Sequence, residues 1–106
     1  MEQADVVYQV IVDTAANDRM AEHLEFLARV SENAASGLLD ELISDIKSLS
    51  SSPLRNPVFN RPHLPSVKYR YMISGKRYRI VYQVDGETVY VDDIQDCRQD
   101  DDKNIL

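Results

Sequence analysis

The sequence predicts an α+β fold in which an N-terminal helical hairpin packs on one face of a small, mainly antiparallel sheet. Three features predict it: an opening β-branched segment, two amphipathic helical segments, and three alternating segments in the second half of the chain. The expected order of elements is therefore β-α-α-β-β-β. With 106 residues, 43% of them hydrophobic, the chain is expected to form a single domain, residues 1–106, around one core.

The first elements follow from residue type and spacing. Residues 6–12, VVYQVIV, are mostly β-branched or aromatic and predict a strand. Thr14 is the expected N-cap of a helix from Ala15 to Glu32, and a second helix is expected from Ala34 to Ser50. Gly37 weakens the second helix by about 1 kcal/mol relative to alanine. Residues expected to be buried recur at helical spacing: Ala16, Met20, Leu24, Leu27 and Val30, then Leu38, Leu42, Ile46 and Leu49.

The second half of the chain combines a proline-rich loop with a strand meander. Residues 53–66 contain all 4 prolines and are expected to lack regular structure. Three strands are expected after this loop, at about 67–73, 77–84 and 88–95. The last strand breaks its alternation at Asp92-Asp93, which predicts a β-bulge.

Alternation also predicts which side chains face the helices. The strand at 77–84 is expected to turn one set of residues toward them: Tyr78, Ile80, Tyr82 and Val84. Its other face carries Arg77, Arg79, Val81 and Gln83. The tyrosines of the strand at 67–73 are expected to join the helix-covered face, which places Lys68 and Arg70 beside Arg79. The uncovered face of the sheet is therefore expected to carry a row of cations.

Charge is strongly segregated along the chain. The net charge of -6 argues against a general nucleic-acid binder. Residues 53–84 nevertheless hold seven basic residues and no acid, while both flanking segments are acidic. A basic middle of this kind can attract one anionic partner. The alternative is that these bases pair with the flanking acids within the fold.

Several classes of site and location are not expected. Cys97 is the only cysteine, and the N-terminus has no signal-peptide pattern, so a cytoplasmic protein is expected. No apolar run is long enough to span a membrane. His23 and His63 lie in different elements, and there is no glycine-rich phosphate loop, so neither a metal nor a nucleotide cofactor is expected. Cys97 is expected to be buried, and His63 exposed.

The element order and the string Tyr78-Arg79-Ile80-Val81-Tyr82-Gln83-Val84 resemble the RelE/ParE superfamily of bacterial type II toxin–antitoxin toxins. The resemblance spans nearly the whole chain, including Ala15-x-x-Asp18 and Leu49-x-x-x-Pro53. It implies a growth-inhibiting, plasmid-stabilising toxin that is neutralised by a cognate antitoxin protein. RelE-like members cleave mRNA on the ribosome, whereas ParE-like members inhibit DNA gyrase.

The resemblance also implies a set of site residues. Arg79 matches the family's strand arginine and Arg98 a second arginine, while two further cations occupy the strand where RelE-like enzymes keep lysines. The predicted catalytic residues are Arg79, Arg98, Lys68 and Arg70. The predicted partner-binding residues are Arg77, Gln83 and Arg61. Cations on a rigid sheet are suited to stabilising phosphate charge. The alternative is that Arg79 and Arg98 pair with aspartates: Asp92, Asp93 or Asp96.

The C-terminal segment departs from both branches of the superfamily. Residues 97–103 contain no histidine or tyrosine, which are the terminal catalytic groups of ribonuclease members. Asp96 stands where many ParE-like members have a histidine, so whether the chain is an enzyme stays open. Long helices and the negative net charge favour a ParE-like gyrase inhibitor. The alternatives are a ribosome-dependent mRNA endoribonuclease and an inactivated toxin that only binds an acidic peptide.

Overall fold

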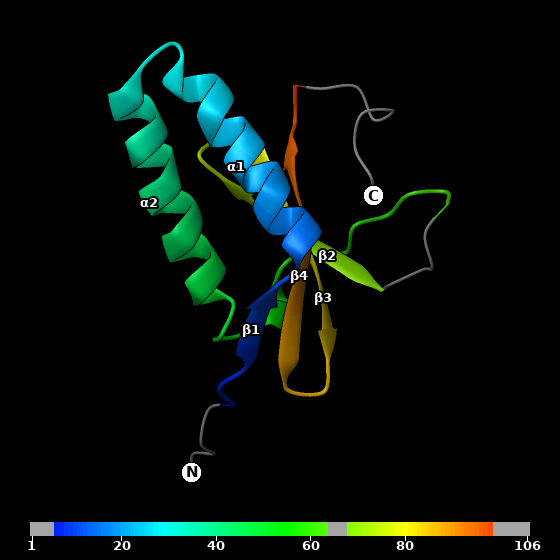
Figure 1. The fold of residues 1–106 in the computed structure, drawn as a ribbon. Coiled ribbons are helices and arrows are strands. Elements are labelled where there is room, and N and C mark those ends of the chain that lie inside the picture. Colours follow the sequence, from blue (N-terminus) through cyan, green and yellow to red (C-terminus); the bar gives the residue numbers. More distant parts are fainter. Residues whose placement is uncertain (1–5, 64–67, 99–106) are drawn as a thin grey trace.

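A computed structural model describes residues 6–63 and 68–98 of the chain. Its elements are β1 (Gln9–Val12), α1 (Thr14–Ala28), α2 (Glu32–Ser48), the 3-10 helix η1 (Pro53–Arg55), β2 (Tyr69–Ser74), β3 (Tyr78–Asp85) and β4 (Thr88–Asp96). This order confirms the predicted α+β class (Figure 1). Predictions that fall on residues 64–67 and 99–106 lie outside the described residues. Within the described ranges, no helix is long and apolar enough to cross a membrane.

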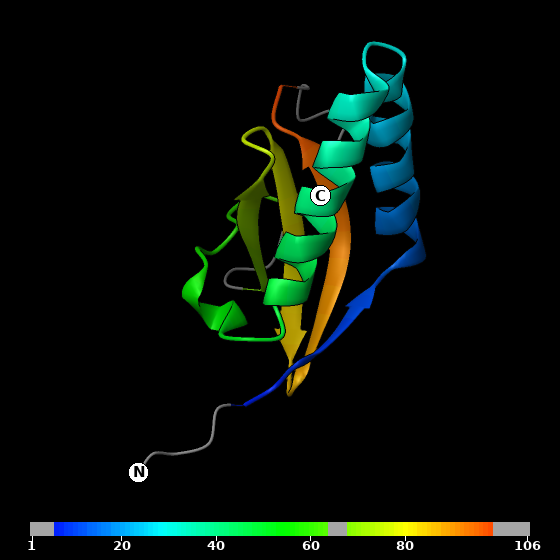
Figure 2. The ribbon, with the colours of Figure 1, turned by 90° about the vertical axis from the view of Figure 1, so that its left-hand side faces the viewer.

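The four strands form one sheet in the order β1-β4-β3-β2. β1 pairs with β4 in parallel, whereas the other two pairs are antiparallel, so the predicted mainly antiparallel sheet is confirmed. Both helices stand on the same side of the sheet (Figure 2), and the described part of the loop between α2 and β2 follows the outer edge of β2, where Val58 pairs with Arg70. Asn56 of this loop contacts Tyr82 on the helix side, whereas Phe59 packs with Val81 on the opposite face.

Each of the two α-helices begins where a side-chain oxygen accepts a hydrogen bond from a free backbone N–H. Asp13, and not the expected Thr14, caps α1 by accepting from the N–H two residues further on at 3.3 Å. Ser31 caps α2 by accepting from the N–H three residues further on at 3.1 Å, and α2 begins two residues earlier than predicted. Ser31 has extended backbone angles, φ -158 and ψ 116, and no helix can pass through it. α1 therefore ends at Ala28 instead of Glu32.

The main core lies between the helices and the sheet. Its buried residues are Ala16, Leu38, Leu42, Ile46, Leu49, Tyr78, Ile80, Tyr82, Val89, Val91 and Ile94. The predicted apolar stripe of α2 is thus confirmed. On α1, Met20, Leu24 and Leu27 are partly buried against this core, but Val30 lies beyond the end of the helix and is 79% exposed.

The predicted bulge in β4 is confirmed by the pairing of β3 with β4. Val81 lies opposite Asp93 and Tyr82 lies opposite Val91, so the register skips Asp92. The extra residue rotates the rest of the strand by one position. Apolar side chains on both sides of the bulge consequently face the helices.

The predicted facing of β2 is wrong. Arg70 lies opposite Tyr82, and Tyr71 lies opposite Val81. Directly opposed side chains share a face, so Arg70 is on the helix side and Tyr71 is not. The physical reason is the three-residue turn 75–77, which pairs Ser74 with Tyr78 and sets the register of the whole hairpin. Residue type alone does not reveal this register.

The sequence predicts that the face opposite the helices is uncovered. This prediction is wrong, because Phe59 packs there. Part of the 53–66 loop pairs with β2 through two backbone hydrogen bonds of 2.7 and 3.1 Å, and η1 gives the loop some regular structure. Phe59, Tyr69 and Val81 form a second, smaller buried cluster here, with Tyr71 packed against it. We call this side of the sheet the loop-covered face.

Candidate functional site

Two arginines lie against one aromatic ring on the loop-covered face. Phe59 is 2% exposed, and the centroid of its ring lies 4.3 Å from Cζ of Arg61 and 5.0 Å from Cζ of Arg79. A guanidinium over an aromatic ring gains about 0.5–1 kcal/mol at an exposed site. We call Phe59, Arg61 and Arg79 the arginine–phenylalanine cluster. It brings together one predicted catalytic and one predicted partner-binding residue.

Arg79 is held by an amide and not by a carboxylate. Its Nε and Nη2 both donate to Oε1 of Gln95, at 2.8 and 2.5 Å. Gln95 lies directly opposite Arg79 on β4 and is fully buried. Within residues 6–63 and 68–98, Arg79 therefore pairs with Gln95 and not with an aspartate. The positive charge of Arg79 is fixed in place by this bond without being neutralised.

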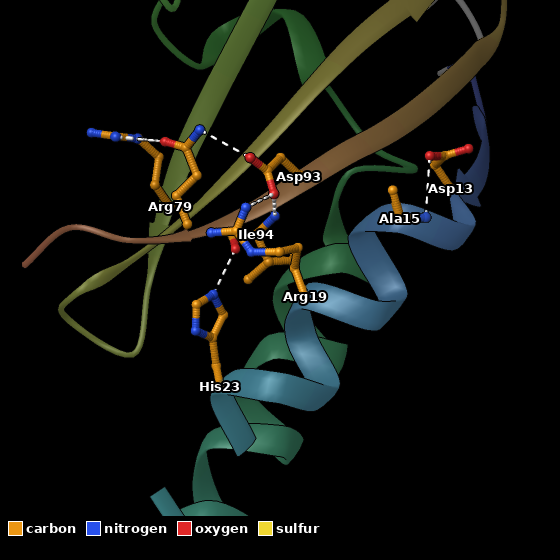
Figure 3. A network of polar contacts seen from close by, with 8 residues as sticks. Asp13, Ala15, Arg19, His23, Arg79, Asp93 and Ile94 are labelled. Carbon is orange, nitrogen blue, oxygen red and sulfur yellow. Dashed lines mark hydrogen bonds and ion pairs between the residues drawn. The ribbon is translucent and has the colours of Figure 1, made fainter. Parts of the chain in front are cut away.

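Gln95 bonds to Arg79 and to Asp93 and so belongs to a polar network that reaches Arg19 on α1 (Figure 3, which labels these three partners). Its Nε2 donates to Oδ2 of Asp93 at 3.1 Å, and Oδ1 of Asp93 lies 3.2 Å from Nη1 of Arg19 on α1. Oδ1 of Asp93 also accepts from the backbone N–H of Ile94 at 2.9 Å. Sequence reasoning selected neither Arg19 nor Gln95. The available signal was a pair of polar residues, Asp93 and Gln95, next to a bulge in an otherwise apolar strand.

α1 also takes the place of a neighbouring strand along the last part of β4. β1 ends at Val12, opposite Val91, so beyond that point β1 no longer pairs with β4. His23 on α1 is 7% exposed, and its Nε2 donates to the carbonyl oxygen of Ile94 at 2.7 Å. A buried carbonyl without such a donor costs about 1–3 kcal/mol. His23 is thus a structural residue that spacing alone did not identify.

Arg98 does not join the arginine–phenylalanine cluster. Its Nε and Nη2 donate to the two carboxylate oxygens of Asp96 at 3.1 and 2.8 Å. These bonds hold the pKa of the Asp96 carboxyl below its ordinary value and raise the pKa of Arg98. Asp96 lies opposite Tyr78, on the helix side, whereas Arg79 lies opposite Gln95. The predicted pair of arginines therefore divides between the two faces, and the alternative of an aspartate partner holds for Arg98.

The two supporting cations also separate. Nη1 of Arg70 donates to the carbonyl oxygen of Asn56 at 2.7 Å, on the helix side of the sheet. Nζ of Lys68 lies 5.2 Å from the ring centroid of Tyr69, which belongs to the loop-covered face. The predicted row of Lys68, Arg70 and Arg79 on one face is therefore wrong for Arg70. Lys68 and Arg79 share the loop-covered face.

The other predicted partner-binding residues lie in two places. Nε2 of Gln83 donates to Oδ2 of Asp92 at 2.6 Å on the loop-covered face. Burial raises the pKa of Asp92, and the hydrogen bond from Gln83 opposes that shift. Arg77 is exposed and lines a groove of about 370 Å³ between α2 and the β2–β3 turn. Gln83 thus belongs with Arg61, while Arg77 lies apart from them.

Two further predictions concern single residues. Cys97 is exposed, so the expectation that it is buried is wrong. Its backbone N–H donates to the carbonyl oxygen of Arg77 at 2.8 Å, but it follows the last residue of β4 and its side chain lies outside the core. His63 is exposed, as predicted. Across residues 6–63 and 68–98, no group of three or more acidic, histidine or cysteine side chains could hold a metal ion.

The arginine–phenylalanine cluster is chemically suited to binding an anionic group. A guanidinium has five N–H donors, and the bond to Gln95 engages two of its nitrogens, so donors are left for a carboxylate or phosphate. Phe59 and Gln95, which contact Arg79, cannot take up or release a proton at neutral pH. The guanidinium of Arg79 is therefore held by two groups that leave its positive charge available to an anion.

Comparison with known proteins adds three findings. A family model described as "ParE toxin of type II toxin-antitoxin system, parDE" matches residues 10–101. A solved chain from the chromosomal ParDE toxin–antitoxin system of P. aeruginosa is similar with a TM-score of 0.69 and 10% identity, over 85% of this chain and 96% of that chain. A chain from the RelBE2 toxin–antitoxin complex of Mycobacterium tuberculosis gives a TM-score of 0.57 and 21% identity, over 90% and 97%. No curated protein matches the sequence. The structural likenesses confirm the predicted fold.

Proposed function

We propose, from the premise that this chain belongs to the family of ParE toxins of type II toxin–antitoxin systems, that it inhibits growth by acting on DNA gyrase. The match of the family model over residues 10–101 carries the proposal. The similar solved chains come from a ParDE system and a RelBE2 toxin–antitoxin complex, which supports a cognate antitoxin as the neutralising partner. The proposed location is the cytoplasm, where a gyrase target would be found.

The geometry around Arg79 supports an inhibitor that binds over one that cleaves. Cleavage of mRNA requires a group that deprotonates the attacking 2′-hydroxyl. The side chains of Phe59 and Gln95, which contact Arg79, are not such groups, although Lys68 and Tyr71 share this face. The second predicted arginine, Arg98, is engaged by Asp96 on the helix side. A ribonuclease would also gain from a basic surface, whereas the net charge of this chain is -6. These observations favour gyrase inhibition over RNA cleavage.

Arg79 and Arg61 are the proposed contacts for the target. Their guanidiniums share the ring of Phe59, and Lys68 adds a third cation on the same face. A fixed guanidinium binds a carboxylate in a defined direction, and such charge-assisted bonds are stronger than neutral ones. The proposed binding surface is thus an acidic patch on gyrase that meets the loop-covered face of the toxin.

The test is a pair of assays on the purified full chain. We expect the chain to block ATP-dependent supercoiling by gyrase and to leave mRNA intact on programmed ribosomes. Ribosome-dependent cleavage of mRNA with normal supercoiling would instead establish the RelE-like alternative. No effect in either assay, with growth also unaffected, would favour an inactivated toxin that only binds a peptide.

A matched pair of variants shows whether the effect comes from the proposed surface. Arg79→Met keeps an apolar stem of similar length but removes the charge, and Arg29→Met does the same at an exposed position near the end of α1. We expect inhibition by the first variant to be weakened about tenfold or more, as for a lost charged hydrogen bond, and the second variant to inhibit like the unaltered toxin. Equal loss in both variants would argue that only the overall charge of the protein matters.

A further inference from the structure

The network of Arg19, Asp93 and Gln95 connects the helix layer with the loop-covered face (Figure 3). It passes along the part of β4 that lies beyond the end of β1, where α1 is the neighbouring element. Asp93 and Gln95 are fully buried, and the side chain of Arg19 is 12% exposed. Buried polar groups are costly unless they are hydrogen-bonded, and the contacts of this network supply that compensation.

Asp93 determines which way the amide of Gln95 points. An ionised carboxylate can only accept hydrogen bonds, so it takes the Nε2 end of the amide at 3.1 Å. Oε1 is then turned toward Arg79, where it accepts from Nε and Nη2. A reversed amide would place N–H donors against the N–H donors of the guanidinium. The charge of Asp93 therefore creates the acceptor that holds Arg79.

Arg19 in turn holds Asp93. Its Nη1 lies 3.2 Å from Oδ1 of Asp93, so an ion pair with α1 accompanies the bond from Asp93 to Gln95. Arg19 is one turn before His23, which bonds to the carbonyl oxygen of Ile94 on the same stretch of β4. Two contacts thus fix α1 against this strand at neighbouring positions.

We propose that Arg19, Asp93 and Gln95 are positioning residues for Arg79, through which α1 sets the direction of its guanidinium on the loop-covered face. The ring of Phe59, 5.0 Å from Cζ of Arg79, restricts the guanidinium from a second side. This proposal depends on the proposed function only in one respect, the identity of the target that Arg79 binds. The orientation of Arg79 is a property of the toxin alone and can be measured alone.

The first arm of the test measures that orientation by NMR on the ¹⁵N-labelled full chain. The side-chain Nε–Hε signal of Arg79 is identified by its loss in Arg79→Lys. We expect Asp93→Asn and Arg19→Met to shift this signal and to speed the exchange of Hε with water about tenfold, as expected when one hydrogen bond is lost. Arg19→Lys keeps the charge and is expected to preserve the signal.

The second arm measures the dose of toxin that halves the growth rate. Asp93→Asn and Arg19→Met are expected to raise this dose about two- to tenfold, because the main donor group of the cluster is no longer fixed. Ile46→Val is the matched control: it loosens the helix-covered core without touching the network. In the Arg79→Lys background, the effect of Asp93→Asn is expected to shrink, because the two residues act through one contact.

The outcomes separate the two proposals. An Arg79 signal that responds to Asp93→Asn, in a toxin that leaves gyrase unaffected, supports the positioning role and overturns the proposed target. A signal and a dose that are unchanged in Asp93→Asn, in a toxin that inhibits gyrase, overturn the positioning role. The positioning role would also be overturned if Ile46→Val raised the dose as much as Asp93→Asn while the Arg79 signal stayed unchanged. The network would then contribute only to stability.

Discussion

The two faces of the sheet differ in what covers them and in what they contain. The helix-covered face is a continuous apolar core built from both helices and from β3 and β4. The loop-covered face has a small cluster of Phe59, Tyr69 and Val81 beside arginines and a buried polar network. The comparison suggests a division of roles, in which one face provides most of the folding free energy. The other face then has room to hold cations in fixed positions.

The largest expected effect comes from opening the helix-covered core. Leu42 is fully buried in α2, and Leu42→Ala is expected to lower the free energy of unfolding by about 2–5 kcal/mol through lost burial and a cavity. Urea unfolding followed by circular dichroism measures the change. A loss well below this range would show that the helices contribute less to stability than the comparison assumes.

The two faces also differ in how well the sequence predicts them. The apolar stripe of α2 was predicted correctly because helical spacing alone decides which residues are buried. The face to which each β2 side chain points was predicted wrongly. It depends on the register set by the 75–77 turn, and residue type does not reveal that register. The partnership of His23 with Ile94 joins residues 71 positions apart, and no local pattern predicts such a contact.

A substitution in the smaller cluster should affect binding more than folding. Phe59→Leu keeps an apolar side chain but removes the aromatic ring that Arg61 and Arg79 share. We expect stability to fall by about 1 kcal/mol, and growth inhibition to weaken because both guanidiniums lose a contact. Unfolding experiments and a growth assay on the same variant measure the two effects. A stability loss as large as that of Leu42→Ala would remove the distinction between the faces.

A stabilising change in the helix layer should leave activity unaltered. Gly37 lies inside α2, and a Cβ added there would meet nothing within 4 Å. Gly37→Ala is therefore expected to raise the free energy of unfolding by about 0.5–1 kcal/mol through the higher helix propensity of alanine. Thermal unfolding and the growth assay test this together. Lost inhibition in a stabilised variant would mean that this surface of α2 takes part in target binding.

The smallest expected effect concerns the ion pair on the helix side. Asp96 has a lowered pKa because of its bonds to Arg98, so its contribution to stability is present above the ordinary value of 3.8 and is lost as the pH falls through the lowered pKa. Asp96→Asn is expected to cost about 0.2–0.5 kcal/mol at neutral pH, since Arg98 is largely exposed. Urea unfolding of both proteins at several pH values measures this. The difference should disappear in acid, and a difference that grows there would contradict the assigned pKa direction.

The division between the faces is tested most directly by comparing Arg79→Met with Arg98→Met in the gyrase supercoiling assay. The sequence predicts these two arginines as one pair, yet they lie on opposite faces. Of the two, Arg98 bonds to a carboxylate and Arg79 to an amide in the described part of the chain. The division between the faces predicts that Arg79→Met weakens inhibition about tenfold or more, as for a lost charged hydrogen bond, while Arg98→Met inhibits like the unaltered toxin. Equal loss in both variants, or loss in Arg98→Met alone, would contradict it.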